Sequence, residues 1–273
     1  MGGGRPSLLA LVVPAVTAAA VATAALALAL WPPGTADRDH VAPVPADTEG
    51  VPREAPAGPP EEDGFALWAR DGAGLPLRWD ACAPVPFLLS LPAPDHAEDD
   101  LREALAVLAE ASGLELVLLG ATEERPTADR ALVEDTPEGW RWRPVLVAWE
   151  HPARTALPLD VHDRGVAVPV AVRDGDRETF VTGQVLINAA RTDLRPGFGD
   201  RSDAVGATLL HEIAHVLGLA HVDDPTQIMS QSPGSGPVLL GAGDLAGLRA
   251  VGAAAGCRPA PDPAAGRGLR GAP

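Results

Sequence analysis

The stretch that decides the interpretation of this 273-residue chain is His211-Glu212-Ile213-Ala214-His215-Val216-Leu217-Gly218-Leu219-Ala220-His221. It fixes five positions in the pattern H-E-x-x-H-x-x-G-x-x-H. At about one in twenty per position, the pattern would arise by chance in a chain of this length roughly once in ten thousand. The pattern is therefore a strong signal, and its spacing has a physical reason.

The spacing suits a metal site built on one helix and the turn that follows it. His211 and His215 are four residues apart, which places their imidazoles one turn apart on the same helix face. Glu212 points beside that face, where it can act as general base on a water molecule and then protonate a leaving amine. Gly218 can adopt the left-handed conformation that ends the helix, so that His221 supplies the third ligand. The stretch predicts one Zn²⁺ held by three neutral histidines, with a fourth position open.

The composition excludes several other chemistries. All 21 basic residues are arginines and tyrosine is absent, which rules out a lysine Schiff base, a P-loop lysine and a tyrosine acid. The 37 acidic residues give a net charge of -16, which would repel a nucleic-acid backbone. We therefore expect no nucleic-acid partner, and metal-assisted hydrolysis through histidine and glutamate is the chemistry that the chain is best equipped to perform.

The chain divides into four parts by composition. Residues 1–31 carry a long uncharged apolar run, which predicts a membrane anchor or a signal segment. Residues 32–64 are rich in proline and acidic residues and predict a disordered linker. Residues 65–258 are the predicted globular domain, and residues 259–273 return to proline, glycine and alanine, which predicts a disordered tail. We expect a single-pass protein of the cell membrane with this domain outside, or alternatively a protein secreted after signal cleavage.

Apolar patterning within the globular part predicts an α+β domain, because strands gather early and helices late. The predicted strands are 85–91, 114–119, 145–149, 166–172 and 180–187. The predicted helices are about 95–111, 203–217 and 243–251. The first two strands and the helix between them form a predicted strand-helix-strand unit.

The motif resembles that of the metzincin metalloproteases. These proteases have a methionine turn beneath the metal, and Met229 lies eight residues past His221 with a proline between them, a spacing similar to that of the matrixin branch. The resemblance covers most of residues 79–257 and implies a zincin-like fold, with a twisted, mostly parallel sheet and three main helices. It also implies that Asp244 supports the methionine turn and that residues 165–169 form an edge strand along which an extended substrate lies.

Three features leave alternatives open. Asp244 is equally compatible with an aspartate that stabilises the N-terminus of its own helix. Cys82 precedes the first predicted strand and Cys257 follows the last helix, so a disulfide is expected in an exported chain, with two free thiols as the alternative. The segment Asp160-Val161-His162-Asp163 fits a solvated turn better than a second metal site, so we expect no additional structural metal.

The motif and the resemblance together imply a zinc-dependent endopeptidase that hydrolyses peptide bonds of extracellular or cell-envelope proteins. Its partners would be protein or peptide substrates and, through the N-terminal segment, a membrane, and we expect a monomer. Two other functions stay open. One is a zinc-binding module that recognises a partner without cutting it, although the intact Glu212 argues against this; the other is an adhesion domain with a chance motif.

Overall fold

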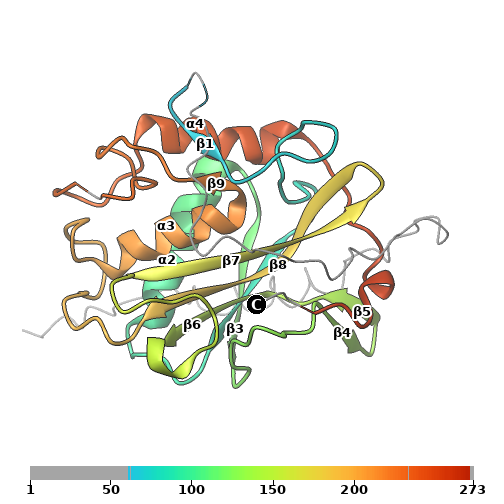
Figure 1. The fold of residues 1–273 in the computed structure, drawn as a ribbon, viewed down its shortest axis with the longest axis horizontal. Coiled ribbons are helices and arrows are strands. Elements are labelled where there is room, and N and C mark those ends of the chain that lie inside the picture. Colours follow the sequence, from blue (N-terminus) through green and yellow to red (C-terminus); the bar gives the residue numbers. More distant parts are fainter. Residues whose placement is uncertain (1–60, 62, 233, 271–273) are drawn as a thin grey trace, which may run out of the picture. The chain divides into compact units, whose positions relative to one another are not determined.

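The computed structural model describes residue 61, residues 63–232 and residues 234–270. A five-stranded sheet organises these residues (Figure 1). Its strands are β2 (Val85–Ser90), β3 (Leu116–Thr122), β6 (Val145–Glu150), β7 (Gly165–Asp174) and β8 (Arg177–Asn188). Their order is β3-β2-β6-β8-β7, in which β7 alone runs antiparallel to its neighbour. The expected α+β class and mostly parallel sheet are confirmed.

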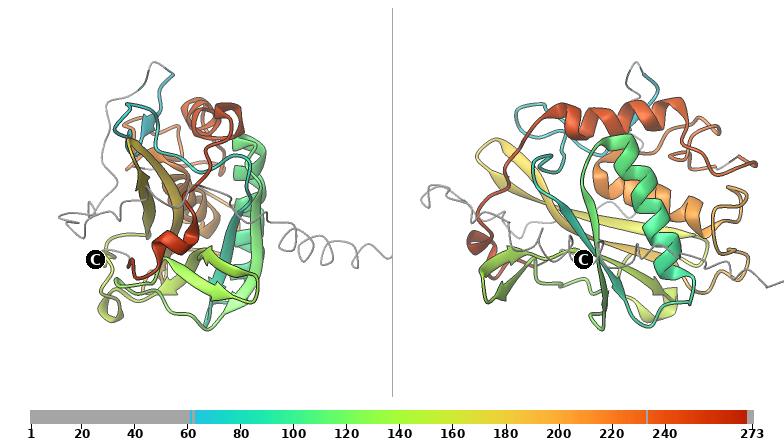
Figure 2. Two further views of the ribbon diagram at one scale, coloured as in Figure 1. Left: turned by 90° about the vertical axis from the view of Figure 1, so that its right-hand side faces the viewer. Right: turned by 180° about the vertical axis from the view of Figure 1, so that it is seen from behind.

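The described residues contain three α-helices, α2 (Ala97–Ser112), α3 (Val205–Leu217) and α4 (Ala242–Val251). Helix α2 connects the parallel strands β2 and β3, as the predicted strand-helix-strand unit requires. Helices α2 and α3 pack together against the sheet, and α4 packs on α2 (Figure 2). The predicted bounds of all three helices agree with the structure to within two residues.

The sheet is covered on both faces, which explains its continuous apolar strands. Every residue of β6 is buried. In β8, Val185 and Ile187 belong to the core beneath the helices, whereas Leu186 packs on the other face with Leu157 and Leu159. The alternation of side chains along β8 therefore joins two apolar clusters through one strand.

A short strand pair joins the first described segment of the chain to the histidine motif. Strand β1 (Ala66–Leu67) pairs antiparallel with β9 (Leu219–Ala220), which follows α3 directly. The Trp68 N–H also donates to the Gly218 carbonyl at 2.8 Å. The first described segment of the chain thus packs next to the end of the motif helix, a pairing that apolar patterning over two residues could not predict.

The two ends of the domain are joined covalently. Cys82 and Cys257 form a disulfide, with their Cα atoms 5.1 Å apart. Close by, Asp71 and Arg258 form a buried ion pair. The alternative of two free thiols is therefore excluded.

The expectation of a disordered tail is wrong for residues 259–270. The tail packs on the hairpin of β4 (Val133–Thr136) and β5 (Gly139–Trp142). Trp142 donates from Nε1 to the Pro261 carbonyl at 3.1 Å. A Cβ on Gly266 would lie 2.5 Å from the Trp142 ring, so the small residues of the tail let its backbone lie close against an aromatic surface. Low side-chain volume, which suggests disorder in a sequence, here permits close packing.

The predicted membrane segment, residues 1–31, lies outside the described residues, as does the linker up to residue 60. Among the residues that the structure does describe, no helix has the length and apolar character needed to cross a membrane.

Replacing Cys82 and Cys257 together by serine is expected to lower the free energy of unfolding by about 2–5 kcal/mol. The disulfide spans 175 residues, so its loss frees the unfolded chain to adopt many more conformations. Urea unfolding of the oxidised protein and of the double variant measures the difference. Reductant should destabilise the wild type and leave the variant unchanged; equal midpoints for the oxidised wild type and the variant would contradict the prediction.

Candidate metal centre

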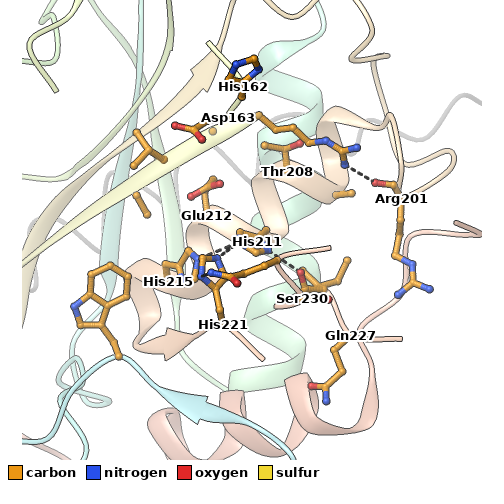
Figure 3. Close-up of a pocket in the computed structure, with 18 residues that line it drawn as sticks. His162, Asp163, Arg201, Thr208, His211, Glu212, His215, His221, Gln227 and Ser230 are labelled. Carbon is orange, nitrogen blue, oxygen red and sulfur yellow. Dashed lines mark hydrogen bonds between the residues drawn. The ribbon is translucent and has the colours of Figure 1, made fainter. Parts of the chain in front are cut away.

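The three motif histidines converge on one point (Figure 3). His211 and His215 project from α3, and His221 follows β9. The Nε2 atom of His211 lies 3.0 Å from each of the other two Nε2 atoms, and those two are 3.1 Å apart. The structure therefore brings together all three residues that the sequence predicts as ligands, in one group that could hold a metal ion.

Backbone carbonyls set the tautomer of two of these imidazoles. The Nδ1 atom of His211 donates to the Ile228 carbonyl at 2.7 Å, and the Nδ1 atom of His215 donates to the Leu219 carbonyl at 2.8 Å. A carbonyl oxygen only accepts, so each ring carries its hydrogen on Nδ1 and a lone pair on Nε2. Two lone pairs 3.0 Å apart repel each other unless a cation lies between them, which is the arrangement expected of metal-ligating histidines.

The surroundings keep these imidazoles neutral. Burial and, to a smaller extent, the neighbouring His221 lower the pKa of His211 to about 4. Burial also lowers the pKa of His215 well below its ordinary value, with the other two histidines adding to the effect. A neutral imidazole is the form that binds a metal. Three imidazole nitrogens at this spacing can all reach one ion at about 2.0–2.1 Å, and an all-nitrogen set favours zinc over calcium or magnesium, so these residues fit Zn²⁺.

Gly218 ends α3 and turns the chain toward His221. Its φ is +118°, a left-handed conformation that other residues rarely adopt. Its N–H donates to the carbonyls of Ala214 and His215, and a Cβ at this position would lie 2.8 Å from the Leu77 carbonyl oxygen. Both the conformation and the close approach require glycine, as the motif predicts.

Asp244 holds the turn that contains Met229. Its Oδ1 atom accepts from the Met229 N–H at 3.2 Å, and its Oδ2 atom accepts from the N–H groups of Ile228 and Gly241, each at 2.7 Å. Met229 is buried, and its carbonyl accepts from Val222, the residue after His221. Asp244 thus supports the turn and caps its own helix at once, so both interpretations of this residue are correct.

Glu212 lies between α3 and the start of β7. It is buried, and a Cβ built on Gly165 would lie 2.8 Å from its Cγ and 3.1 Å from its Oε1. Burial raises the pKa of Glu212 to about 8, and the nearby Asp163 contributes to the rise. Sequence reasoning identified Glu212 and placed Gly165 in the edge strand, but it missed that the lack of a side chain at Gly165 makes room for the carboxyl group.

A cavity of about 460 Å³ opens beside the three histidines and Glu212. One wall is the first part of β7, Gly165 to Ala167, which belongs to the edge strand of the sheet. Residues 165–169 therefore lie in the edge strand beside the site, as the sequence analysis expects. An extended chain could pair with such an edge directly above the histidines.

Several residues that line the cavity were not predicted. The Trp68 ring lies 5.4 Å from the His215 ring, and the Gln231 side-chain amide lies 3.1 Å from Nδ1 of His221. His162 and Asp163 line it from a turn in which the Asp160 N–H donates to Asp163. The histidine and aspartates of this turn were a visible signal in the sequence, but their proximity to Glu212 is a tertiary contact that no local pattern reveals.

Comparison with protein-family models gives no match to this chain, and comparison with curated proteins likewise finds no similar sequence. The fold and the site define an α+β protein with a buried three-histidine cluster that could bind a metal ion.

Asp244→Asn is expected to weaken zinc binding about 10- to 100-fold, because the turn that positions the His211 acceptor loses part of its support. The amide nitrogen would face backbone N–H groups that the carboxylate now accepts. Competition with a chromophoric chelator measures the affinity. Asp262→Asn is the matched control, since Asp262 accepts from the Ala264 N–H far along the chain in the tail; equal weakening in both variants would contradict the assigned role.

Proposed function

We propose that this chain is a zinc-dependent endopeptidase, a metzincin similar to the matrixins. The observation that carries the proposal is the convergence of three imidazole Nε2 atoms, 3.0–3.1 Å apart, beside a buried glutamate in an open cavity. His211, His215 and His221 would hold the ion. A zinc ion bound there would act as a Lewis acid and bring the pKa of a water molecule toward neutrality.

Glu212 has the position of the proton carrier. Its carboxyl group lies over the histidines and faces the cavity (Figure 3). A zinc ion bound beside it would lower its pKa below the value of about 8 that burial sets. The ionised carboxylate would then accept a proton from the attacking water and deliver that proton to the leaving amine. The close approach of Gly165 restricts where the carboxyl group can lie.

The edge strand gives the site a means of binding a peptide. A substrate in extended conformation would pair with the backbone of Gly165 to Ala167, and the cavity would take side chains close to the scissile bond. In this mode of binding, most of the affinity comes from hydrogen bonds to the backbone of an unfolded segment and less from its side chains. Protein and peptide substrates therefore suit the site better than compact small molecules.

The proposed enzyme would act outside the cytoplasm. The disulfide between Cys82 and Cys257 suits an oxidising compartment. The apolar N-terminal sequence would direct export and leave the domain either attached to the membrane or secreted. Substrates would then be extracellular or cell-envelope proteins, cleaved by a monomer.

Glu212→Gln is expected to lower kcat/KM on unstructured protein substrates by at least about 100-fold while keeping one zinc per chain. Removal of the general base stops proton transfer but leaves all three histidines in place. Zinc content by mass spectrometry and cleavage of casein measure the two effects. Glu110→Gln, on the exposed face of α2, is the control. Equal activity in Glu212→Gln, or wild-type protein without zinc, would refute the mechanism; zinc without activity on a broad peptide library would favour the non-catalytic binding module.

Gly165→Ala is expected to lower kcat about 10- to 100-fold with zinc affinity unchanged. The new methyl group would lie 2.8 Å from Cγ of Glu212 and 2.9 Å from the Leu186 carbonyl, so the carboxyl group must move, and small displacements of a catalytic group carry losses of this size. Steady-state kinetics and chelator competition separate the two quantities. Gly199→Ala is the control, because a Cβ there meets no atom within 4 Å. Unchanged kcat in Gly165→Ala would show that the position of Glu212 is not critical.

A further inference from the structure

The cavity extends beyond the histidines to an end that the proposed hydrolysis does not use. Thr208 of α3 and Ser230 line the cavity between the histidines and this end (Figure 3). Arg201 also lines the cavity and lies beyond Thr208 and Ser230 as seen from the histidines (Figure 3). The far end of the cavity is therefore lined by an arginine.

Arg201 is incompletely paired within the part of the chain that the structure describes. Its Nη1 atom donates to the Thr226 carbonyl at 2.6 Å. Its Nε atom is buried and has no hydrogen-bond partner. Among the ion pairs of the described residues, none includes Arg201. The Nε atom is enclosed by protein and out of reach of a ligand, so an incoming carboxylate would have to bind the Nη groups of Arg201.

The carboxylates that interact electrostatically with Arg201 have other partners. These are Asp200, Asp224 and Asp244. Asp200 accepts from the backbone N–H groups of Ser202 and Gly236, and Asp224 accepts from that of Thr226. Asp244 accepts from the turn and from the start of its own helix, as described above. These carboxylates interact with Arg201 at a distance, but none of them forms an ion pair with its guanidinium group.

A second arginine strengthens the positive charge on this side of the cavity. Arg164 lines the same cavity and donates from Nη1 to the Arg201 carbonyl at 3.0 Å and from Nη2 to the Ser202 carbonyl. Both arginines thus bind backbone carbonyls instead of carboxylates. The two acidic residues in the cavity lining, Asp163 and Glu212, belong to the catalytic side. The arginine end is therefore suited to a negatively charged group.

We propose that Arg201 makes this site select substrates with a carboxylate side chain, aspartate or glutamate, next to the scissile bond. The proposal rests on the proposed peptidase function. A guanidinium group binds a carboxylate through two parallel charge-assisted hydrogen bonds, which a neutral side chain cannot reproduce. A site built around a charged hydrogen-bonding group discriminates strongly against substrates that lack the matching group.

Because the chain is strongly acidic, a preference for acidic substrates would point to a specific group inside the cavity. A net charge of -16 disfavours the approach of acidic peptides in general. A preference for acidic side chains would therefore have to come from a local group inside the cavity, and it would appear at a single substrate position.

The test is a peptide series in which each of three positions on either side of the cleaved bond carries Asp, Asn, Glu, Gln or Leu in turn. Mass spectrometry locates the cut, and kcat/KM is measured for wild type, Arg201→Gln, Arg201→Lys and Arg102→Gln. Arg102 is the control because it is exposed on α2 and pairs with Glu98. Wild type should prefer the acid over its amide about 10- to 100-fold at one position, in line with the usual value of a hydrogen bond to a charged group.

The preference should vanish in Arg201→Gln, persist in part in Arg201→Lys and stay intact in Arg102→Gln. Wild-type cleavage without any acid preference would overturn the proposal and leave the peptidase function standing. A preference that survives in Arg201→Gln would overturn it as well, because Arg164 or another group would then be responsible. Absence of cleavage by zinc-loaded wild type would instead refute the proposed function itself. If Arg201→Gln does not fold, the wild-type profile and the Lys variant decide.

Discussion

The arrangement of the site depends on two backbone carbonyls that fix the histidine tautomers. The Ile228 and Leu219 carbonyls take the Nδ1 hydrogens of His211 and His215, which leaves both Nε2 lone pairs pointing at one another 3.0 Å apart. Such a contact is repulsive by itself, and the fold must hold it in place in the absence of an ion. The surrounding elements therefore have to supply rigidity around these two carbonyl groups.

That rigidity comes from segments distant in sequence. The Leu219 carbonyl belongs to β9, which Gly218 directs away from α3 and which pairs with β1 near the start of the described chain. The Ile228 carbonyl is in a turn whose N–H groups are bound by Asp244 of α4. The disulfide then joins the segment after α4 to the segment before β2. The segment that accepts from His215 is thus held by a pairing with the start of the described chain, whereas the turn that accepts from His211 is held by Asp244, 16 residues further along. A compact histidine motif therefore depends on elements outside the motif.

Apolar patterning predicted the helices and strands that have a local sequence period. It did not predict the short strand pairs or the packing of the tail, which depend on contacts between distant residues. The five sheet strands and three helices follow from apolar periodicity over six or more residues, and their bounds agree closely with the structure. The β1–β9 pair is only two residues long on each side, and the β4–β5 hairpin carries exposed tryptophan and arginine, so neither has a readable period. The tail around Pro261 to Gly266 packs through backbone atoms on Trp142, a contact to which its composition gives no signal.

The same distinction holds within the site. The histidines and Glu212 were identifiable because a helix converts sequence spacing into a shared face. The contact of Gly165 with Glu212 and the place of Arg201 in the cavity were not, because each residue acts from another element across a tertiary contact. Every residue of α3 except His211 is buried, and the cavity beside the histidines is lined by β7 and by two arginines as well as by α3. Residues that control access to a buried helix must come from elsewhere in the chain, and for that reason specificity is the part of function least visible in the motif.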